Sequence, residues 1–248
     1  HLTAVRLIEE LRIKNIERLD AVFITHPHSD HYGGLVPLMN TDLEINVIYM
    51  NDVDEKWMKR EWWGGNYSEI VNIRNTAQKK KILIKDYSNF NSFSFHENCK
   101  FTKLYIFNEE ELADMDIGPD INELSLISEL TYGNHKALFT GDLNKKLSNW
   151  LVKENRQKLA CDVLKVPHHG TEGLASNEFL LATKAKASLI PSPEHLWDQN
   201  RSKRAREILT GMNSQIFLNG VHGNVDVVFS GNAIVITGRK TGKRFIIH

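Results

Sequence analysis

The chain has 248 residues, enough for one large domain or two small ones. Its 31 lysine and arginine residues balance 31 aspartate and glutamate residues, so the overall charge does not indicate a nucleic-acid-binding protein. The only cysteines, Cys99 and Cys161, lack CxxC spacing and signal neither a disulfide framework nor a cysteine zinc site, so we expect two reduced thiols.

Helices and strands alternate in the first part of the chain. Residues 2–14 carry apolar side chains at helical spacing. Residues 21–25 form a short apolar run typical of a strand buried on both faces, and residues 45–50 predict another strand. Residues 52–63 and 67–81 predict two helices, which are separated by Gly64 and Gly65.

Strands dominate from residue 82 onward. Residues 82–87, 92–96 and 101–107 predict single strands, and residues 123–142 predict a hairpin that turns at Gly133 and Asn134. Further strands are expected at 162–166, 187–191, 215–219 and in the closing segment from 225, and helices at 143–157, 176–186 and 200–212. Because no repeat, linker or boundary is visible, the pattern predicts one α/β domain over residues 1–248, with two sheets inside helices.

One stretch, ITHPHSDHYGGL at residues 24–35, concentrates side chains that bind metals. His26, His28, Asp30 and His31 lie within six positions, directly after an expected buried strand. Imidazole and carboxylate groups at this density suit divalent transition metals. Four such groups do not easily serve one tetrahedral ion, so the pattern predicts two ions. His26 and His28 would bind one of them, and Asp30 and His31 the other.

The order HxHxDH followed by two glycines resembles the signature of the metallo-β-lactamase superfamily. Two later motifs, each at the end of an expected strand, match it as well. FTGD places Asp142 where the superfamily has a bridging carboxylate, and VPHHG places His168 and His169 at its last histidine motif. The surrounding sequence is similar to the soluble domain of the DNA-internalisation competence (ComEC-type) branch. The matching residues are Asn122, Ser125, Leu126, Thr140, Gly141, Asp142, Leu164, Lys165, Val166, His168, His169 and Gly170.

The resemblance implies a fold, a metal centre and a reaction. The fold would be a metallo-β-lactamase-like αββα sandwich, with two mixed sheets between helix layers. Its ligands would hold two divalent ions, zinc by default, with manganese or iron as alternatives. The implied ligands are His26, His28, Asp30, His31, Asp142 and His169. The implied catalytic residues are Asp30, which would orient the attacking hydroxide, and His168, which would contact the substrate or help the leaving group.

The chain departs from the superfamily pattern in three places. It begins at a helix rather than at strands, so we expect the first strands to be absent from this chain. A middle histidine ligand is not evident, and His96, Asn122 or water could fill that position, whereas we expect His135 to be solvated in a hairpin turn. The later histidine of the branch is matched only by His195, which belongs either to a substrate loop or to a folded loop anchor.

Three functions remain open. A phosphodiesterase or nuclease, acting on DNA, RNA or a small phosphodiester, is favoured by the ComEC-type resemblance and by two basic clusters. These clusters, residues 79–81 and 201–206, are either solvated helix faces or phosphate contacts. The alternatives are a hydrolase of lactones, thioesters or β-lactams, and a non-enzymatic metal-binding subunit. The chain could also belong to a larger polypeptide or complex. No membrane span or signal peptide is evident, so we expect a cytoplasmic protein.

Overall fold

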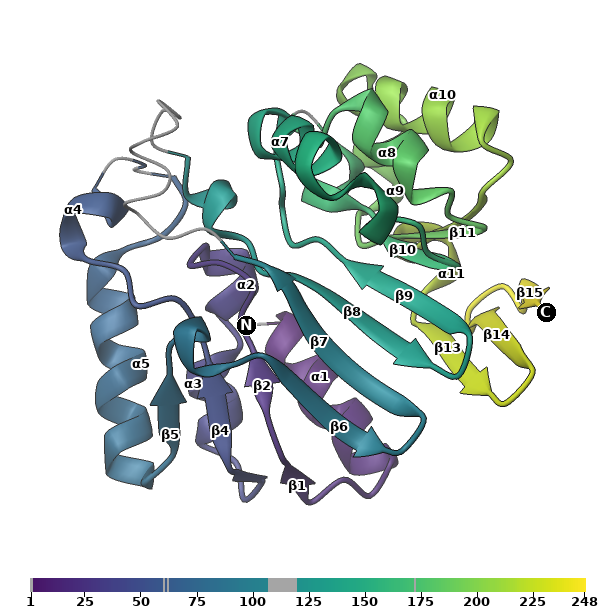
Figure 1. Ribbon diagram of the computed structural model, residues 1–248. Helices are drawn as coiled ribbons and strands as arrows, with labels where there is room; N and C mark the ends of the chain where they lie inside the picture. The colour runs from purple at the N-terminus through teal and green to yellow at the C-terminus, as the bar shows by residue number, and fades with distance from the viewer. Residues whose placement is uncertain (1, 60, 62, 107–119, 172) are drawn as a thin grey trace. The chain divides into compact units, whose positions relative to one another are not determined.

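The computed structural model describes residues 2–59, 61, 63–106, 120–171 and 173–248, and it divides the chain into two compact units (Figure 1). Unit 1 consists of His1–Asn91 and Ile106–Ser125, and unit 2 of Ser92–Tyr105 and Leu126–His248. Both units contain sheets and helices, so the predicted α/β class is confirmed. The single domain stays a prediction.

Unit 1 is built on a small parallel sheet. Its strands are β2 (Val22–Phe23), β4 (Val47–Tyr49) and β5 (Leu83–Lys85), in the order β2-β4-β5. A separate parallel pair joins β1 (Arg18–Leu19) to β3 (Glu44–Ile45). The helices are α1 (Leu2–Ile13), α2 (Ser29–Tyr32), α3 (Leu35–Met39), α4 (Glu55–Met58) and α5 (Tyr67–Lys80), with 3-10 turns η1 (Tyr87–Asn89) and η2 (Ile121–Leu124).

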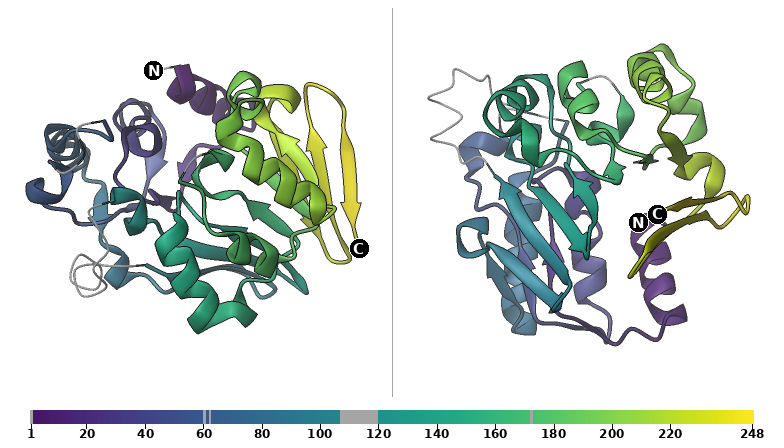
Figure 2. Two further views of the ribbon diagram at one scale, coloured as in Figure 1. Left: turned by 90° about the horizontal axis from the view of Figure 1, so that it is seen from above. Right: turned by 45° about the vertical axis from the view of Figure 1, so that its right-hand side comes forward.

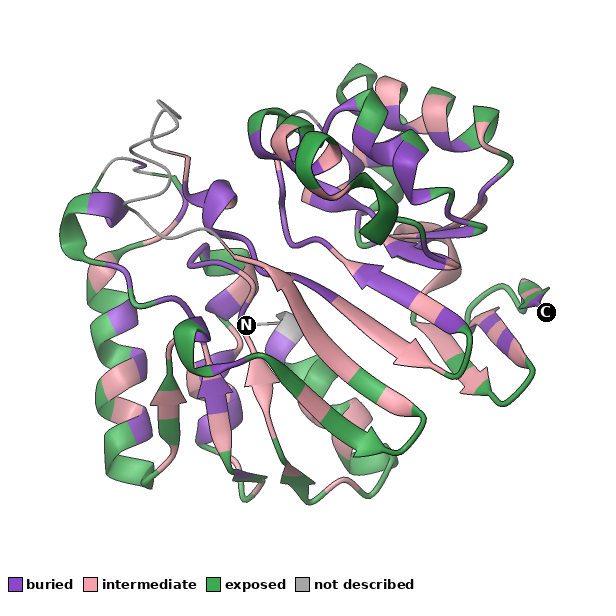
Figure 3. Ribbon diagram, viewed as in Figure 1, coloured by how far each residue is buried: buried purple, intermediate pink, exposed green. Residues whose placement is uncertain are grey.

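Helix α5 shows how the amphipathic pattern was realised. Its buried residues Ile70, Ile73 and Ala77 follow the three-to-four-residue spacing of one helix face, and Figure 3 shows this face as a buried stripe. The Asn66 side chain accepts a hydrogen bond from the Ser68 N–H at the N-terminus, and Lys81 ends the helix in the left-handed region with φ 58°. The predicted helix over residues 67–81 is therefore confirmed.

The predicted helix over residues 52–63 is wrong in extent, because among the described residues of that range, 52–59, 61 and 63, only Glu55–Met58 form a helix, α4. The Asp54 carboxylate caps α4 by accepting from the Trp57 N–H. After α4 the chain instead makes hydrogen bonds with the loop that follows β2. Glu61 binds the His28 side chain, and the Gly64 carbonyl accepts from the Ser29 N–H. These contacts tie Glu61 and Gly64 to that loop, and neither residue is helical.

Unit 2 contains a seven-stranded sheet in the order β12-β11-β10-β9-β8-β7-β6. Strands β6 to β9 are antiparallel, whereas β9 to β12 are parallel. Its strands are β6 (Ser92–His96), β7 (Cys99–Tyr105), β8 (Ile127–Tyr132), β9 (His135–Phe139), β10 (Val163–Lys165), β11 (Ala187–Ile190) and β12 (Gln215–Leu218). A second sheet is formed by β13 (Val225–Ser230), β14 (Ala233–Gly238) and β15 (Arg244–Ile247). The helices are α7 (Lys145–Asn155), α8 (Asn177–Thr183), α9 (Glu194–Trp197), α10 (Lys203–Gly211) and α11 (Asn219–His222), and the 3-10 turns are η3 (Arg156–Lys158), η4 (Pro167–Gly170) and η5 (Asn200–Ser202).

The two faces of the parallel strands are both buried. One face packs against the three-stranded sheet in an apolar cluster that joins β9 to β12 with β14 and β15. Its buried members are Ala137, Val163, Ala187, Phe217, Ile234, Ile236 and Ile247. On the opposite face, Leu138 and Leu164 are fully buried, and the helices α7, α8 and α10 lie on that side (Figure 2). Burial on both faces explains why these strands were recognisable as continuous apolar runs.

Two further expectations concern the whole chain. Both cysteines are free thiols, as predicted, and burial raises the pKa of Cys161 to about 12, which keeps it protonated at neutral pH. Within the described ranges, no helix combines the length and apolarity that a bilayer crossing requires.

Candidate metal centre

The first group of predicted ligands lies in unit 1, where the chain leaves the sheet after β2. The Ile24 N–H still bonds the Tyr49 carbonyl of β4, and the backbone then turns into α2. The His28 carbonyl accepts from the N–H groups of both His31 and Tyr32, which begins the short helix. His26 and His28 are buried side chains, and the buried strand end thus presents them on one loop.

The ring nitrogens of His26 and His28 are arranged as a chelating pair. Nε2 of His26 lies 3.1 Å from Nδ1 of His28. Two nitrogens that bind one tetrahedral zinc ion at about 2.0–2.1 Å would lie about 3.3 Å apart. The donor set and its spacing therefore fit one divalent ion, as the sequence predicted for this pair.

Asp30 and His31 form the second predicted pair. Both come from α2, and Oδ2 of Asp30 lies 3.5 Å from Nε2 of His31. This separation is again close to the distance between two ligand atoms of one ion. The rings of His26 and His31 are neighbours, with centroids 4.1 Å apart. Unit 1 thus brings all four residues of the first motif together as two pairs.

Two side chains that the sequence analysis missed hold the outer nitrogens of these rings. Oγ1 of Thr25 lies 3.1 Å from Nδ1 of His26 and 3.2 Å from Nδ1 of His31. Nε2 of His28 donates to Oε2 of Glu61 over 2.8 Å. Burial alone would lower the pKa of His28, but the hydrogen bond and the charge of Glu61 outweigh burial and raise it above 6.5. Thr25 directly precedes His26 in sequence and could have been considered, whereas no sequence pattern pointed to Glu61.

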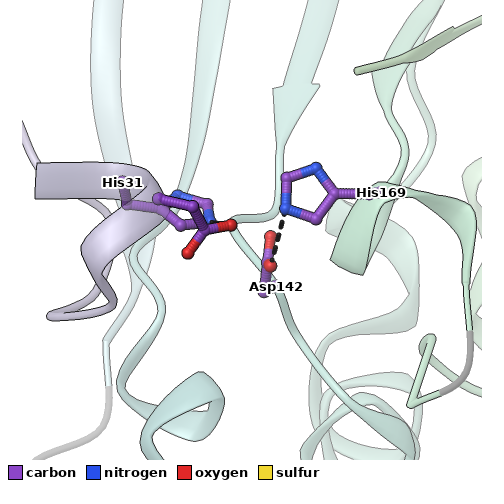
Figure 4. A group of neighbouring side chains, drawn as sticks. His31, Asp142 and His169 are labelled. Carbon is purple, nitrogen blue, oxygen red and sulfur yellow. Dashed lines mark ion pairs between the residues drawn. The ribbon is translucent and has the colours of Figure 1, made fainter. Parts of the chain in front are cut away.

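The second group of predicted ligands lies in unit 2, at the carboxyl ends of three neighbouring parallel strands. Asp142 follows β9, His169 follows β10, and Pro191 follows β11. Carboxyl ends of adjacent parallel strands share one edge of a sheet, which is a common place for ligands to bind. Oδ2 of Asp142 lies 3.1 Å from Nε2 of His169, and the dashed line in Figure 4 marks this ion pair. Nδ1 of His169 donates to the Pro191 carbonyl over 3.0 Å.

The contacts of His169 place a proton on one of its ring nitrogens. A carbonyl oxygen can only accept, so Nδ1 of His169 carries a proton, and Nε2 faces the Asp142 carboxylate. A proton or a metal ion between Nε2 and the carboxylate oxygen would make this 3.1 Å contact favourable. Lys165 donates to Oδ1 of Asp142 over 3.2 Å and to the Gly141 carbonyl over 2.6 Å. The lysine therefore orients the carboxylate.

The backbone of the histidine pair is strained. His168 and His169 adopt φ values of 46° and 54°, which side-chain-bearing residues rarely do and which cost of order 1 kcal/mol each. The loop is anchored from one side by Trp197, because a Cβ on Gly170 would lie 2.6 Å from its ring. Arg201 donates to Oγ1 of Thr171 over 3.2 Å. Segment 194–201 therefore fits the loop-anchor alternative, with His195 on α9.

The remaining histidines and Asn122 have different fates. His96 ends edge strand β6 and is exposed. Asn122 lies in η2 of unit 1, and its Oδ1 is a buried atom with no hydrogen-bond partner in the part of the chain that the structure describes. The expectation that His135 is solvated is wrong: it is buried, with Nδ1 3.4 Å from Oδ2 of Asp162. The hairpin end packs against the strand β10 segment, which excludes water.

The basic clusters also differ from each other. Lys79, Lys80 and Lys81 are exposed at the end of α5, as expected for a solvated face. In the second cluster, Arg204 donates to the carbonyls of Leu174 and Ala175. Arg206 donates to the carbonyls of Trp197 and Gln199. These two arginines hold loops of unit 2, which leaves little of that cluster for phosphate groups.

Comparison with known proteins identifies the family of this chain. Residues 3–195 match the sequence profile of the "Metallo-beta-lactamase superfamily". The chain is 28% identical over 188 residues to ComE operon protein 3 of Bacillus subtilis (strain 168), which is 74% of this chain and 21% of that protein. It is 31% identical over 87 residues to ribonuclease J of Mycoplasma pneumoniae, which is 35% of this chain and 14% of that protein. The chain thus spans about a fifth or less of the curated relatives that it matches.

The fold also has a counterpart of known structure. The metallo-beta-lactamase fold protein YhfI from Bacillus subtilis superposes with a TM-score of 0.50 and 15% identity, over 86% of this chain and 79% of that one. This likeness confirms the predicted fold class. Proteins of the superfamily are mostly hydrolytic enzymes that bind divalent metals. Since the profile match extends over most of the sequence, the chain belongs to the metallo-β-lactamase superfamily.

Proposed function

We propose that this chain is a binuclear metal-dependent phosphodiesterase, with nucleic acid as the favoured substrate class. The observation that carries the proposal is the pairing of donor atoms: His26 with His28 and Asp30 with His31 in unit 1, and Asp142 with His169 in unit 2. The residues that would hold the two ions are His26, His28, Asp30, His31, Asp142 and His169, and Asn122 or water is a further candidate ligand.

The reaction follows from the roles of these side chains. When bound, two divalent ions supply Lewis-acid chemistry and lower the pKa of water to about 7. Oδ1 of Asp30 would accept a hydrogen bond from the attacking water and orient it toward phosphorus. The imidazole of His168 would contact the substrate or give a proton to the leaving group. No side chain needs to act as a nucleophile.

Zinc is the proposed metal, and manganese or iron would suit the same donors. Nitrogen and oxygen ligands without a thiolate do not select a soft metal, so the choice among these ions depends on geometry and supply. The metal-binding side chains of the first motif are histidines and an aspartate, with no cysteine among them. The test therefore includes zinc, manganese and iron.

The choice of a phosphodiester rests on the relatives. One is named as a ribonuclease and another as a product of the ComE operon, and this chain matches only 14% and 21% of their respective lengths. The exposed lysines at the end of α5 offer one contact for a phosphate backbone. If nucleic acid is the substrate, Lys79→Ala with Lys80→Ala would weaken DNA or RNA binding and reduce its dependence on salt.

The test is hydrolysis of bis-p-nitrophenyl phosphate by protein of measured metal content, in zinc, manganese and iron. Asp30→Ala is the informative variant, and Asp42→Ala, an exposed aspartate of the same unit, is its matched control. We expect turnover in the wild type and in Asp42→Ala, and its loss in Asp30→Ala. Single- and double-stranded DNA and RNA would follow. About two bound ions without phosphodiester turnover would refute the proposal, and lactone or thioester hydrolysis, or a binding role, would replace it.

A further inference from the structure

His28 is held by a residue far from it in sequence. Nε2 of His28 donates to Oε2 of Glu61 over 2.8 Å, and the two side chains are only 9% and 3% exposed. A carboxylate oxygen accepts hydrogen bonds, so this contact places the ring proton on Nε2. In the neutral ring, Nδ1 then carries the lone pair, and it is Nδ1 that lies 3.1 Å from Nε2 of His26.

Glu61 is itself fixed. Its second oxygen, Oε1, accepts from the backbone N–H of Ile121 over 2.7 Å. Ile121 opens the 3-10 turn η2, where Asp120 caps the turn by accepting from the Asn122 N–H. Both oxygens of the carboxylate are therefore occupied by donors from two separate segments of unit 1. These two hydrogen bonds set the orientation of the carboxylate toward His28.

The residues that follow Glu61 in sequence also contact the first metal-binding motif. The Gly64 carbonyl accepts from the Ser29 N–H over 2.7 Å. A Cβ on Gly64 would lie 2.4 Å from Cδ2 of His28, so only glycine allows the backbone to pass so close to the ring. The Asn66 N–H donates to Oη of Tyr32 over 3.3 Å. Three backbone contacts thus hold the loop on the motif that carries the predicted ligands.

We propose that Glu61 is the positioning residue of the first metal ion, acting through His28. By holding the proton on Nε2, it keeps Nδ1 of His28 available as a ligand beside Nε2 of His26. Such carboxylate–histidine–metal arrangements make the histidine a stronger ligand and fix its orientation. The inference rests on the proposed function, because it assigns a role toward an ion that those histidines would bind.

The test measures metal affinity rather than turnover. Glu61→Met fills a similar volume but accepts no hydrogen bond, and Glu61→Gln keeps one acceptor. The matched control is Glu55→Gln, since Glu55 lies nearby in α4 and is exposed, with an ion pair to Lys59. Zinc affinity would be determined by competition with a chromogenic chelator. The absorption spectrum of the cobalt-substituted protein would report the ligand geometry.

We expect Glu61→Met to bind one of the two ions about 10- to 100-fold more weakly, with the other ion unchanged. The affinity of Glu61→Gln for that ion should lie between those of Glu61→Met and the wild type, and Glu55→Gln should have wild-type affinity. The cobalt spectrum should change in Glu61→Met, which loss of stability alone would not cause in a folded protein.

Folded Glu61→Met with both affinities within twofold of the wild type would overturn the inference. If that variant does not fold, Glu61→Gln decides, and wild-type affinity and cobalt spectrum there would also overturn it. His28→Ala separates this outcome from failure of the metal site. If His28→Ala binds ions as the wild type does, the proposed metal centre is wrong and the proposed function fails with it.

Discussion

Thr25 offers the sharpest test of the metal centre, because one hydroxyl lies against two of the proposed ligands. Its Oγ1 is 3.1 Å from Nδ1 of His26 and 3.2 Å from Nδ1 of His31. A hydroxyl oxygen has two acceptor lone pairs, so it can accept from both rings. Each ring would then present Nε2 as a lone pair toward its own ion. Thr25→Val keeps the branched shape and removes both acceptors.

We expect Thr25→Val to weaken the binding of both metal ions. Removing an outer partner of a ligating histidine weakens metal binding by about 10- to 100-fold, or about 1.4–2.8 kcal/mol. Because His26 and His31 are assigned to different ions, both affinities should fall together. The metal-free protein should lose about 1–3 kcal/mol of unfolding free energy, since two ring N–H groups lose their acceptor.

Competition titration with a chromogenic zinc chelator measures both affinities, and chemical unfolding of the metal-free protein measures the stability. Thr25→Ser should restore binding, because the hydroxyl returns. Thr41→Val is the matched control, since Oγ1 of Thr41 donates to the Leu38 carbonyl at the end of α3. If Thr25→Val loses affinity for one ion only, or if Thr25→Ser binds metal as weakly as Thr25→Val, the assignment of Thr25 to both rings is wrong.

Three further outcomes are expected. His169→Ala should bind one of the two ions at least about 100-fold more weakly, as measured by chelator competition. His168→Ala should bind both ions with wild-type affinity, but its initial rate of hydrolysis should fall by about 100-fold or more. Arg204→Met should lower the unfolding free energy by about 2–3 kcal/mol in urea titration, because Arg204 donates over 2.6–2.9 Å to two loop carbonyls and to Oδ1 of Asn177, while the exposed Lys203→Met changes little. Burial opposes ionisation of Asp162, but hydrogen bonds from Lys186 and the Lys136 N–H outweigh it and lower its pKa below 3.8. That carboxylate therefore stabilises the fold above about pH 4, and the stability is lost as the pH falls through its folded pKa. The difference of about 1–2 kcal/mol between wild type and Asp162→Asn at pH 7 should shrink in acid, and a constant difference would contradict this reasoning.

Local sequence determined the elements and the ligand types. The helix over residues 67–81 and the strands from β8 to β15 lie where the spacing of apolar residues predicted them. This spacing indicates which face of a helix or strand is buried, so it can be recognised within a short segment. The first motif is also local: His26 and His31 are five positions apart, and a strand that ends in a short helix is enough to gather them. Asp142 and His169 were predictable because each follows a recognisable strand, and parallel neighbours end at one edge.

Only the tertiary structure decided which partners hold these ligands. His28 is bound by Glu61, 33 positions away, and His169 by the carbonyl of Pro191, 22 positions away. The same holds for Arg204, whose cluster the sequence left as either a solvated helix face or a phosphate contact, and whose side chain instead binds two backbone carbonyls. A hydrogen bond depends on direction and on distances of about 3 Å. Residue type and spacing along the chain do not specify such geometry between distant segments, so it emerges only when those segments pack.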